Sequence, residues 1–149
     1  IAVRPSYEIL KTLVNEHGRE GKKNGKGFYD YPGDGNKHLW PELINLYPPQ
    51  SEQPSQQDLV DRLMFIQANE SARCYEENVV RSVADTNIGS IFGWGFAPQH
   101  GGTLQFINAM GVDEFVKRSR ELAAKYGERF EPAQILLDMA AKGEAFSDD

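Results

Sequence analysis

Apolar side chains recur every three or four residues along most of this chain, which is the spacing of helices with one buried face. Proline, serine, aspartate and glycine residues at typical helix ends bound these stretches. The pattern predicts helices over 6–17, 41–47, 56–78, 83–92, 102–110, 113–126 and 132–142. Strand patterns of comparable strength do not occur between them. The sequence therefore predicts an all-α fold, a helical bundle.

Local signals mark the starts of three of these helices. Ser55 stands three residues before Asp58, and Ser82 stands three residues before Asp85. Both pairs have the arrangement of a capping box, in which the serine side chain accepts a backbone N–H of the first turn. Asp113 is the expected cap of the helix that follows it.

Two helices carry distinctive surface patterns. The longest one has a broad apolar stripe, which is typical of a core-facing surface, formed by Leu59, Val60, Leu63, Met64, Phe65 and Ile66. The helix over 113–126 has charges four residues apart, and these are expected to pair as Glu114 with Arg118 and Glu121 with Lys125.

The segment 48–57 contains three prolines and four glutamines, a composition that predicts a linker between a module over 1–47 and a module over 58–149. Residues 4–18 resemble residues 130–143, since both have a proline start, an Ile-Leu pair and a glycine stop. This hint of a repeat and the first residue, which is not Met, indicate a piece of a longer protein. Such a piece would begin in the tail of one repeat and continue into a nearly complete second repeat.

Composition narrows the classes of function. The 149 residues carry a net charge of −6, which argues against nucleic acid as a general partner because phosphate binding needs a positive surface. The single cysteine, Cys74, excludes an internal disulfide and favours a reducing compartment; in mid-helix it is expected to be inert. The sequence has no apolar run of about 20 residues, so no membrane span is expected.

Several landmarks follow one another in a specific order. They are the Gly-Lys-Lys-Asn-Gly-Lys-Gly-Phe-Tyr run at 21–29, the helix from Asp58 to Asn78, Asp85, Gly-Trp-Gly-Phe-Ala-Pro at 93–98, Gly101-Gly102, Gly-Val-Asp at 111–113 and Arg-Phe-Glu-Pro at 129–132. Together they resemble the C-terminal helical domain of 3-hydroxyacyl-CoA dehydrogenases. The similarity is to the multifunctional fatty-acid β-oxidation enzymes, which carry two such domains in tandem, and it covers most of the chain.

The resemblance implies a function for the whole protein. Enzymes of this family oxidise a 3-hydroxyacyl-CoA to a 3-ketoacyl-CoA and pass a hydride to NAD. In the family, NAD and a catalytic histidine–glutamate pair belong to an upstream Rossmann domain. The implied partners are therefore the upstream NAD-binding and first helical domains of the same polypeptide, with acyl-CoA as substrate. The implied location is cytoplasmic, or mitochondrial or peroxisomal in a eukaryote.

This chain itself has little of the catalytic apparatus. It contains no Gly-rich NAD fingerprint after a strand pattern, so NAD binding by this chain alone is not expected. We expect His17 to contact a helix end or solvent, and we expect none of His17, His38 and His100 to be catalytic. No cluster of cysteine and histidine at metal-ligand spacing is present.

The start of the longest helix provides the sharpest comparison with the family. Residues 60–63, Val-Asp-Arg-Leu, match a stretch in which the active domains carry a catalytic asparagine. Asp61 stands at that position, and a carboxylate cannot donate the amide hydrogen bond. Its charge would also oppose a developing alkoxide. The second repeat is therefore expected to be structural, with no catalytic residue.

The lysine loop is open to two interpretations. Lys22, Lys23 and Lys26 could contact the phosphates of CoA together with glycine amides. Alternatively they are solvated charges on a tight turn, with Phe28 and Tyr29 as its core anchor, and this interpretation is favoured because surface lysines are common.

Two further groups have a structural and a functional interpretation. Trp94 and Phe96 could line an acyl pocket, but we favour a turn that is pinned to the core. Asn69 and Glu70 are polar residues beside an apolar stripe, and a hydrogen bond in helix packing is the favoured interpretation.

The sequence thus predicts the C-terminal helical region of a multifunctional 3-hydroxyacyl-CoA dehydrogenase. Its role would be packing: it would support the catalytic helical domain and replace a contact that a second subunit makes in simpler dimeric relatives. The isolated chain is expected to be inactive. The main alternative is a stand-alone all-α interaction module without acyl-CoA chemistry. A small acyl-CoA carrier is a third hypothesis.

Overall fold

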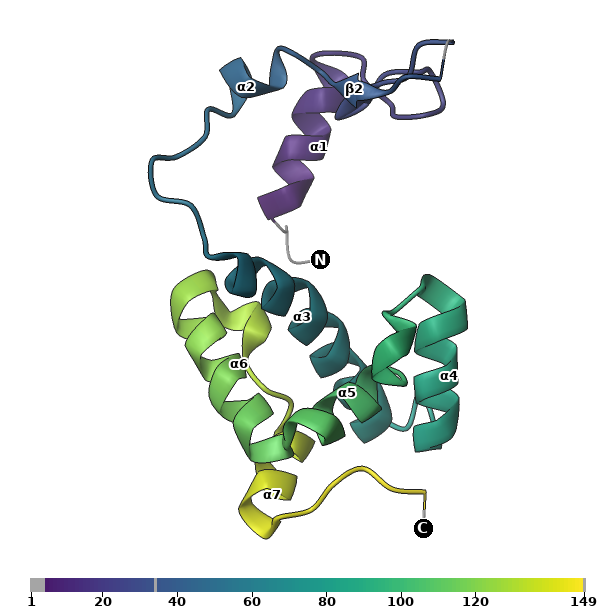
Figure 1. Ribbon diagram of the computed structural model, residues 1–149, viewed down its shortest axis with the longest axis vertical. Helices are drawn as coiled ribbons and strands as arrows, with labels where there is room; N and C mark the ends of the chain where they lie inside the picture. The colour runs from purple at the N-terminus through teal and green to yellow at the C-terminus, as the bar shows by residue number, and fades with distance from the viewer. Residues whose placement is uncertain (1–4, 34, 149) are drawn as a thin grey trace. The chain divides into compact units, whose positions relative to one another are not determined.

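The computed structural model describes residues 5–33 and 35–148 (Figure 1). The chain divides into two compact units, Ile1–Gln53 and Pro54–Asp149. This division falls inside the segment 48–57, whose composition predicts a linker.

The first unit contains two helices and a small hairpin. Its elements are α1 (Pro5–Asn15), β1 (Tyr29–Asp30), β2 (His38–Leu39) and α2 (Leu43–Leu46). The strands are antiparallel, with Tyr29 opposite Leu39 and Asp30 opposite His38. The sequence did not predict this hairpin, because strands of two residues are too short to leave an alternating pattern.

Arg19 organises this unit more than an apolar core does. Its Nε donates to the carbonyl oxygen of Gly27 at 2.6 Å, and its guanidinium forms an ion pair with Asp30. The same guanidinium lies 4.2 Å from the centre of the Trp40 ring. Leu13 is the one fully buried apolar side chain among the residues described in this unit. The first unit is therefore held by a buried cation and its acceptors, with many apolar side chains left exposed.

All regular elements of the second unit are helices. Its elements are α3 (Gln56–Glu76), α4 (Val83–Trp94), η1 (Pro98–His100), α5 (Thr103–Met110), α6 (Val112–Tyr126), η2 (Glu128–Phe130) and α7 (Gln134–Lys142). The ends of the predicted helices in both units agree with these bounds to within two residues. The prediction of an all-α bundle is confirmed, apart from the small hairpin of the first unit.

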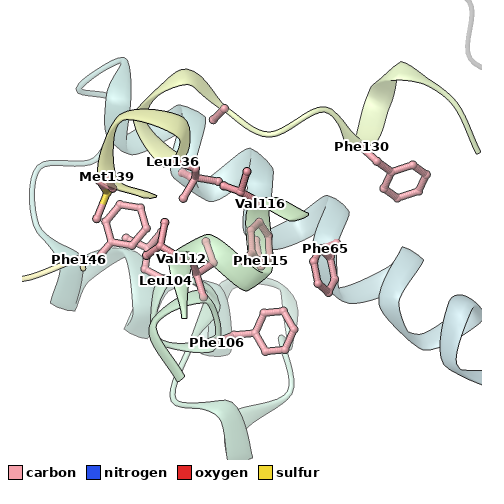
Figure 2. Packing of buried hydrophobic residues seen from close by; sticks show 14 of the residues in the cluster. Phe65, Leu104, Phe106, Val112, Phe115, Val116, Phe130, Leu136, Met139 and Phe146 are labelled. Atoms are coloured by element: carbon pink, nitrogen blue, oxygen red, sulfur yellow. The ribbon is translucent and has the colours of Figure 1, made fainter. Parts of the chain in front are cut away.

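Three phenylalanines from three helices form the centre of the second unit's core (Figure 2). Phe65 of α3 and Phe115 of α6 stack face to face, with ring centres 4.3 Å apart. Phe106 of α5 contacts both rings edge-on, at 5.8 and 6.2 Å. Offset stacks and edge contacts are the favourable arrangements for aromatic rings. This cluster fixes which face of α3 is buried.

The capping predictions were right at two helices and wrong at a third. Ser55 Oγ accepts the N–H of Asp58, and Ser82 Oγ accepts the N–H of Asp85, each at 3.0 Å. Asp113 does not cap α6, which already begins at Val112 after Gly111. Gly111 has a φ of 92°, which a side chain adopts only with strain, so this glycine lets α6 begin directly after α5.

Three asparagines bind backbone groups that lie far from them in the sequence. The Asn69 amide donates to Glu131 O at 2.5 Å and accepts from Ala133 N at 2.8 Å. Asn87 accepts the N–H groups of residues 104 and 105, and Asn108 makes two bonds to the backbone of residue 146. The prediction that Asn69 makes a packing hydrogen bond is therefore confirmed. Asn69 and Asn108 thus satisfy backbone groups of loops that have no regular pairing, and Asn87 satisfies N–H groups in the first turn of α5.

We predict that Asn69→Ala lowers the free energy of unfolding of the second unit by about 1–3 kcal/mol. Asn69 is 1% exposed, and its removal leaves the N–H of Ala133 without a partner, while the carbonyl oxygen of Glu131 keeps its hydrogen bond from Arg73. Urea unfolding followed by circular dichroism measures the change. Gln105→Ala, on the exposed side of α5, is the control and should stay within about 0.5 kcal/mol. Equal effects of the two substitutions would contradict this role of Asn69.

Candidate functional site

Asp61, which the sequence comparison singled out, is held in a contact between α3 and α6. One carboxylate oxygen accepts from Arg118 Nε at 2.7 Å, and the other accepts from Gln57 Nε2 at 2.7 Å. Asp61 is 7% exposed. Both carboxylate oxygens are therefore used within the protein.

Asp58 lies one turn earlier on the same face of α3 and binds three groups of α6. It accepts from Lys125 Nζ at 2.6 Å, from Tyr126 Oη at 2.5 Å and from Arg118 Nη2 at 2.7 Å. These hydrogen bonds, that from Lys125 first, hold the pKa of Asp58 far below its ordinary value of 3.8. The same contacts raise the pKa of Arg118 and that of Lys125, each chiefly through its bond to Asp58.

The ion pairs predicted along α6 were wrong. Arg118 and Lys125 reach across to α3 instead of pairing with the residues four positions before them. Glu114 pairs with Lys117 at 3.3 Å, and Glu121 pairs with Arg118 at 3.1 Å, in both cases over three residues. The buried carboxylates of α3 attract these cations more strongly than exposed glutamates do, because solvent screens the latter.

The three histidines lie in different surroundings. The His17 ring is 5.1 Å from Trp40, and the His100 ring is 5.1 Å from Phe106. His38 Nε2 lies 3.7 Å from a carboxylate oxygen of Asp30, which also pairs with Arg19. His17 is exposed to solvent just after the end of α1, as expected, and one side of its ring contacts Trp40.

The structure leaves both interpretations of the lysine loop open. Lys22, Lys23 and Lys26 are all exposed, and Lys23 Nζ lies 2.9 Å from Glu20, which raises the pKa of Lys23. The backbone of Lys26 pairs with Gly21 across the turn. The expected core anchor of this loop was wrong, because the side chains at positions 28 and 29 are more than a third exposed.

Large apolar side chains remain exposed on both α3 and α4. We use the name α3–α4 surface for these side chains, Leu59 and Leu63 of α3 and Ile88, Phe92 and Trp94 of α4, each 47–85% exposed. Ile88 and Phe92, four residues apart, share one face of α4, and Trp94 lies on another face of it. Trp94 Nε1 donates to Gln67 Oε1 at 2.9 Å, and Gln67 in turn bonds Leu63 O one turn earlier. The indole of α4 is therefore fixed beside the exposed face of α3.

This surface corrects two expectations. The apolar stripe of α3 was expected to face the core, but of its six residues only Phe65 is fully buried, and Leu59, Val60 and Leu63 are exposed. Phe96 is buried at 2% exposure as predicted, whereas Trp94 is not pinned to the core. Apolar side chains that are exposed next to one another on a helix, such as Ile88 and Phe92 at a spacing of four residues, are candidates for a protein–protein contact.

No family model matches this chain. Among the described residues, no helix is long and apolar enough to cross a membrane. Over the same residues, no group of three or more histidine, cysteine, aspartate or glutamate side chains is placed to hold a metal ion. Cys74 is partly buried, and burial raises the pKa of its thiol.

We predict that Asp58→Asn reduces the loss of unfolding free energy that the second unit shows at low pH. Because the folded pKa of Asp58 lies below 3.8, its ionised form stabilises the fold above about pH 4, and this contribution is lost as the pH falls towards the lowered pKa. The variant should be less stable at pH 7 and lose less stability between pH 4 and pH 2. Urea unfolding at several pH values measures both effects.

The control for this experiment is Asp138→Asn, on the exposed side of α7. It should leave the pH dependence of unfolding as in the original chain. A pH dependence that Asp58→Asn leaves unchanged would contradict the assigned role of the Asp58 hydrogen bonds.

We predict that replacing Lys22, Lys23 and Lys26 together by alanine does not change the affinity of the chain for CoA. The three ammonium groups are exposed, and exposed charges interact weakly with ions in solution. Calorimetric titration with CoA should show no binding heat for the original chain and none for the triple variant. Heat that disappears in the triple variant would instead support the phosphate interpretation.

Proposed function

We propose that this chain is the C-terminal helical region of a multifunctional 3-hydroxyacyl-CoA dehydrogenase and that its second unit supports the enzyme by packing. The reaction, oxidation of a 3-hydroxyacyl-CoA with transfer of hydride to NAD, would belong to upstream domains of the same polypeptide. The compartment would be one in which fatty acids are oxidised, the cytoplasm of a bacterium or a mitochondrion or peroxisome.

The α3–α4 surface is the observation that carries the packing part of this proposal, and the sequence resemblance carries the assignment to the dehydrogenase. It presents leucine, isoleucine, phenylalanine and tryptophan side chains from two helices, while the opposite face of α3 packs into an aromatic core. Aromatic and large aliphatic side chains supply most of the binding energy in protein interfaces. The occupant we propose is the first helical domain of the same polypeptide, which would offer a complementary apolar helix face.

The position of Asp61 supports a packing role over a catalytic one. A group that polarises a substrate oxygen must donate a hydrogen bond into the reacting site. Asp61 accepts hydrogen bonds from Arg118 and Gln57 within the second unit. Changing the family's asparagine to aspartate therefore fits a domain in which this position joins two helices.

The test compares NADH formation from a 3-hydroxyacyl-CoA by this chain alone and by the chain joined to its upstream sequence. The proposal predicts activity in the longer polypeptide and none in the chain alone. Activity of the purified chain alone would overturn the packing role. A longer polypeptide that folds but is inactive would favour the alternative, an interaction module without acyl-CoA chemistry.

We predict that Leu63→Asp combined with Phe92→Asp lowers NADH formation by the longer polypeptide about tenfold, because two buried charges would weaken the docking of the second unit. Both side chains are exposed in the chain itself, at 67% and 85%, so its thermal unfolding should not change. Val79→Asp is the matched control, since this valine is 68% exposed but lies between α3 and α4, outside the surface. Equal losses in the control and the double variant would contradict docking through the α3–α4 surface.

A further inference from the structure

The last part of the second unit crosses back over the bundle. Gly143, with a φ of 69°, ends α7, and residues 144–148 continue without regular structure towards the start of α4. Figure 1 shows this yellow segment leaving α7 and running past α5 to α4. We call residues 144–148 the C-terminal strap.

The strap is attached to the bundle at Phe146. The N–H of Phe146 donates to Asn108 Oδ1 and its carbonyl oxygen accepts from Asn108 Nδ2, both at 2.9 Å. The phenyl ring is 7% exposed and contacts the edge of Tyr75, with ring centres 5.7 Å apart. Figure 2 shows this ring next to Met139 of α7. One residue thus links the strap to α3, α5 and α7.

The second attachment is at the first turn of α4. The two carboxylate oxygens of Asp148 accept the N–H groups of Val83 and Ala84 at 2.5 and 2.8 Å. Ser82 accepts the next N–H, that of Asp85, so the serine and the strap share the capping of this helix. A carboxylate at a helix start is favourable because it meets unpaired N–H groups and the positive end of the helix dipole.

Helix α4 depends on such support. It has 12 residues, a length at which an isolated helix is marginal in water. Its buried residues are Val83, Thr86 and Ser90, of which only the valine is apolar. Its middle and its end are tied to other helices through Asn87, Ser90 and Trp94. The contacts of Asp148 are what tie the backbone of its first turn to the rest of the unit.

We propose that the C-terminal strap is a clamp that keeps α4 ordered and thereby controls how the α3–α4 surface is presented. With the strap attached, the first turn of α4 is capped and Ile88, Phe92 and Trp94 are held in place. When the strap detaches, α4 opens from its N-terminal end and the surface loses its fixed shape. The consequence for docking rests on the proposed function, whereas the clamp itself does not.

The test of the clamp is amide hydrogen exchange on the full chain. Asp148→Ala should speed exchange at residues 83–86 about fivefold, the size of effect expected for the loss of a helix cap. Asn108→Ala, which frees the strap at a different point, should speed exchange at the same residues. Asp138→Ala, an exposed aspartate on α7, is the control and should change nothing there. Unchanged exchange at residues 83–86 in both strap variants would overturn the clamp.

A second measurement separates the clamp from the proposed function. In the longer polypeptide, Asp148→Ala should lower NADH formation about fivefold, and Leu63→Asp with Phe92→Asp should lower it as well. If Leu63→Asp with Phe92→Asp lowers activity and Asp148→Ala does not, the strap does not control how the α3–α4 surface is presented, and this inference fails. If neither lowers activity while exchange at 83–86 still rises, the clamp stands and the proposed function fails.

Discussion

The contact of Asp58 and Asp61 with Arg118 is the interaction on which the arrangement of the second unit depends. Both carboxylates lie on the face of α3 that also carries Phe65, and their partner lies on the face of α6 that carries Phe115. The ion pairs and the stacked rings therefore select the same face of α3. Once that face is buried, Leu59 and Leu63 must point outward, because they lie on the other side of the helix.

This constraint explains why the sequence predicted the helices better than their orientation. Helix starts depend on local signals, and Ser55 and Ser82 act as caps where the spacing indicated. The exposed face of α3 could not be predicted, because α3 has apolar residues on both sides. Only tertiary contacts with α6 show which side is buried. Trp94 was misjudged for the same reason, since its neighbour Phe96 has an equivalent local setting but a buried side chain.

The candidate site was predictable only in part. The sequence singled out Asp61 as unsuited to catalysis, and the structure shows where its charge is used. It did not bring Asp58 together with Arg118 and Tyr126, because these residues are up to 68 positions apart and no motif connects them. The Asp148 cap was equally hidden, since nothing in the spacing connects residue 148 with the start of α4 at residue 83. Contacts between distant segments decide both features, and a single sequence does not record them.

We propose that the α3–α4 surface is covered by another domain of a longer polypeptide. Hydroxyl-radical labelling of side chains tests this most directly, with this chain alone compared to the chain joined to its upstream sequence. The account predicts that Leu63, Phe92 and Trp94 become protected in the longer polypeptide while Val79 stays reactive. Equal labelling of Phe92 and Trp94 in the two proteins would contradict it.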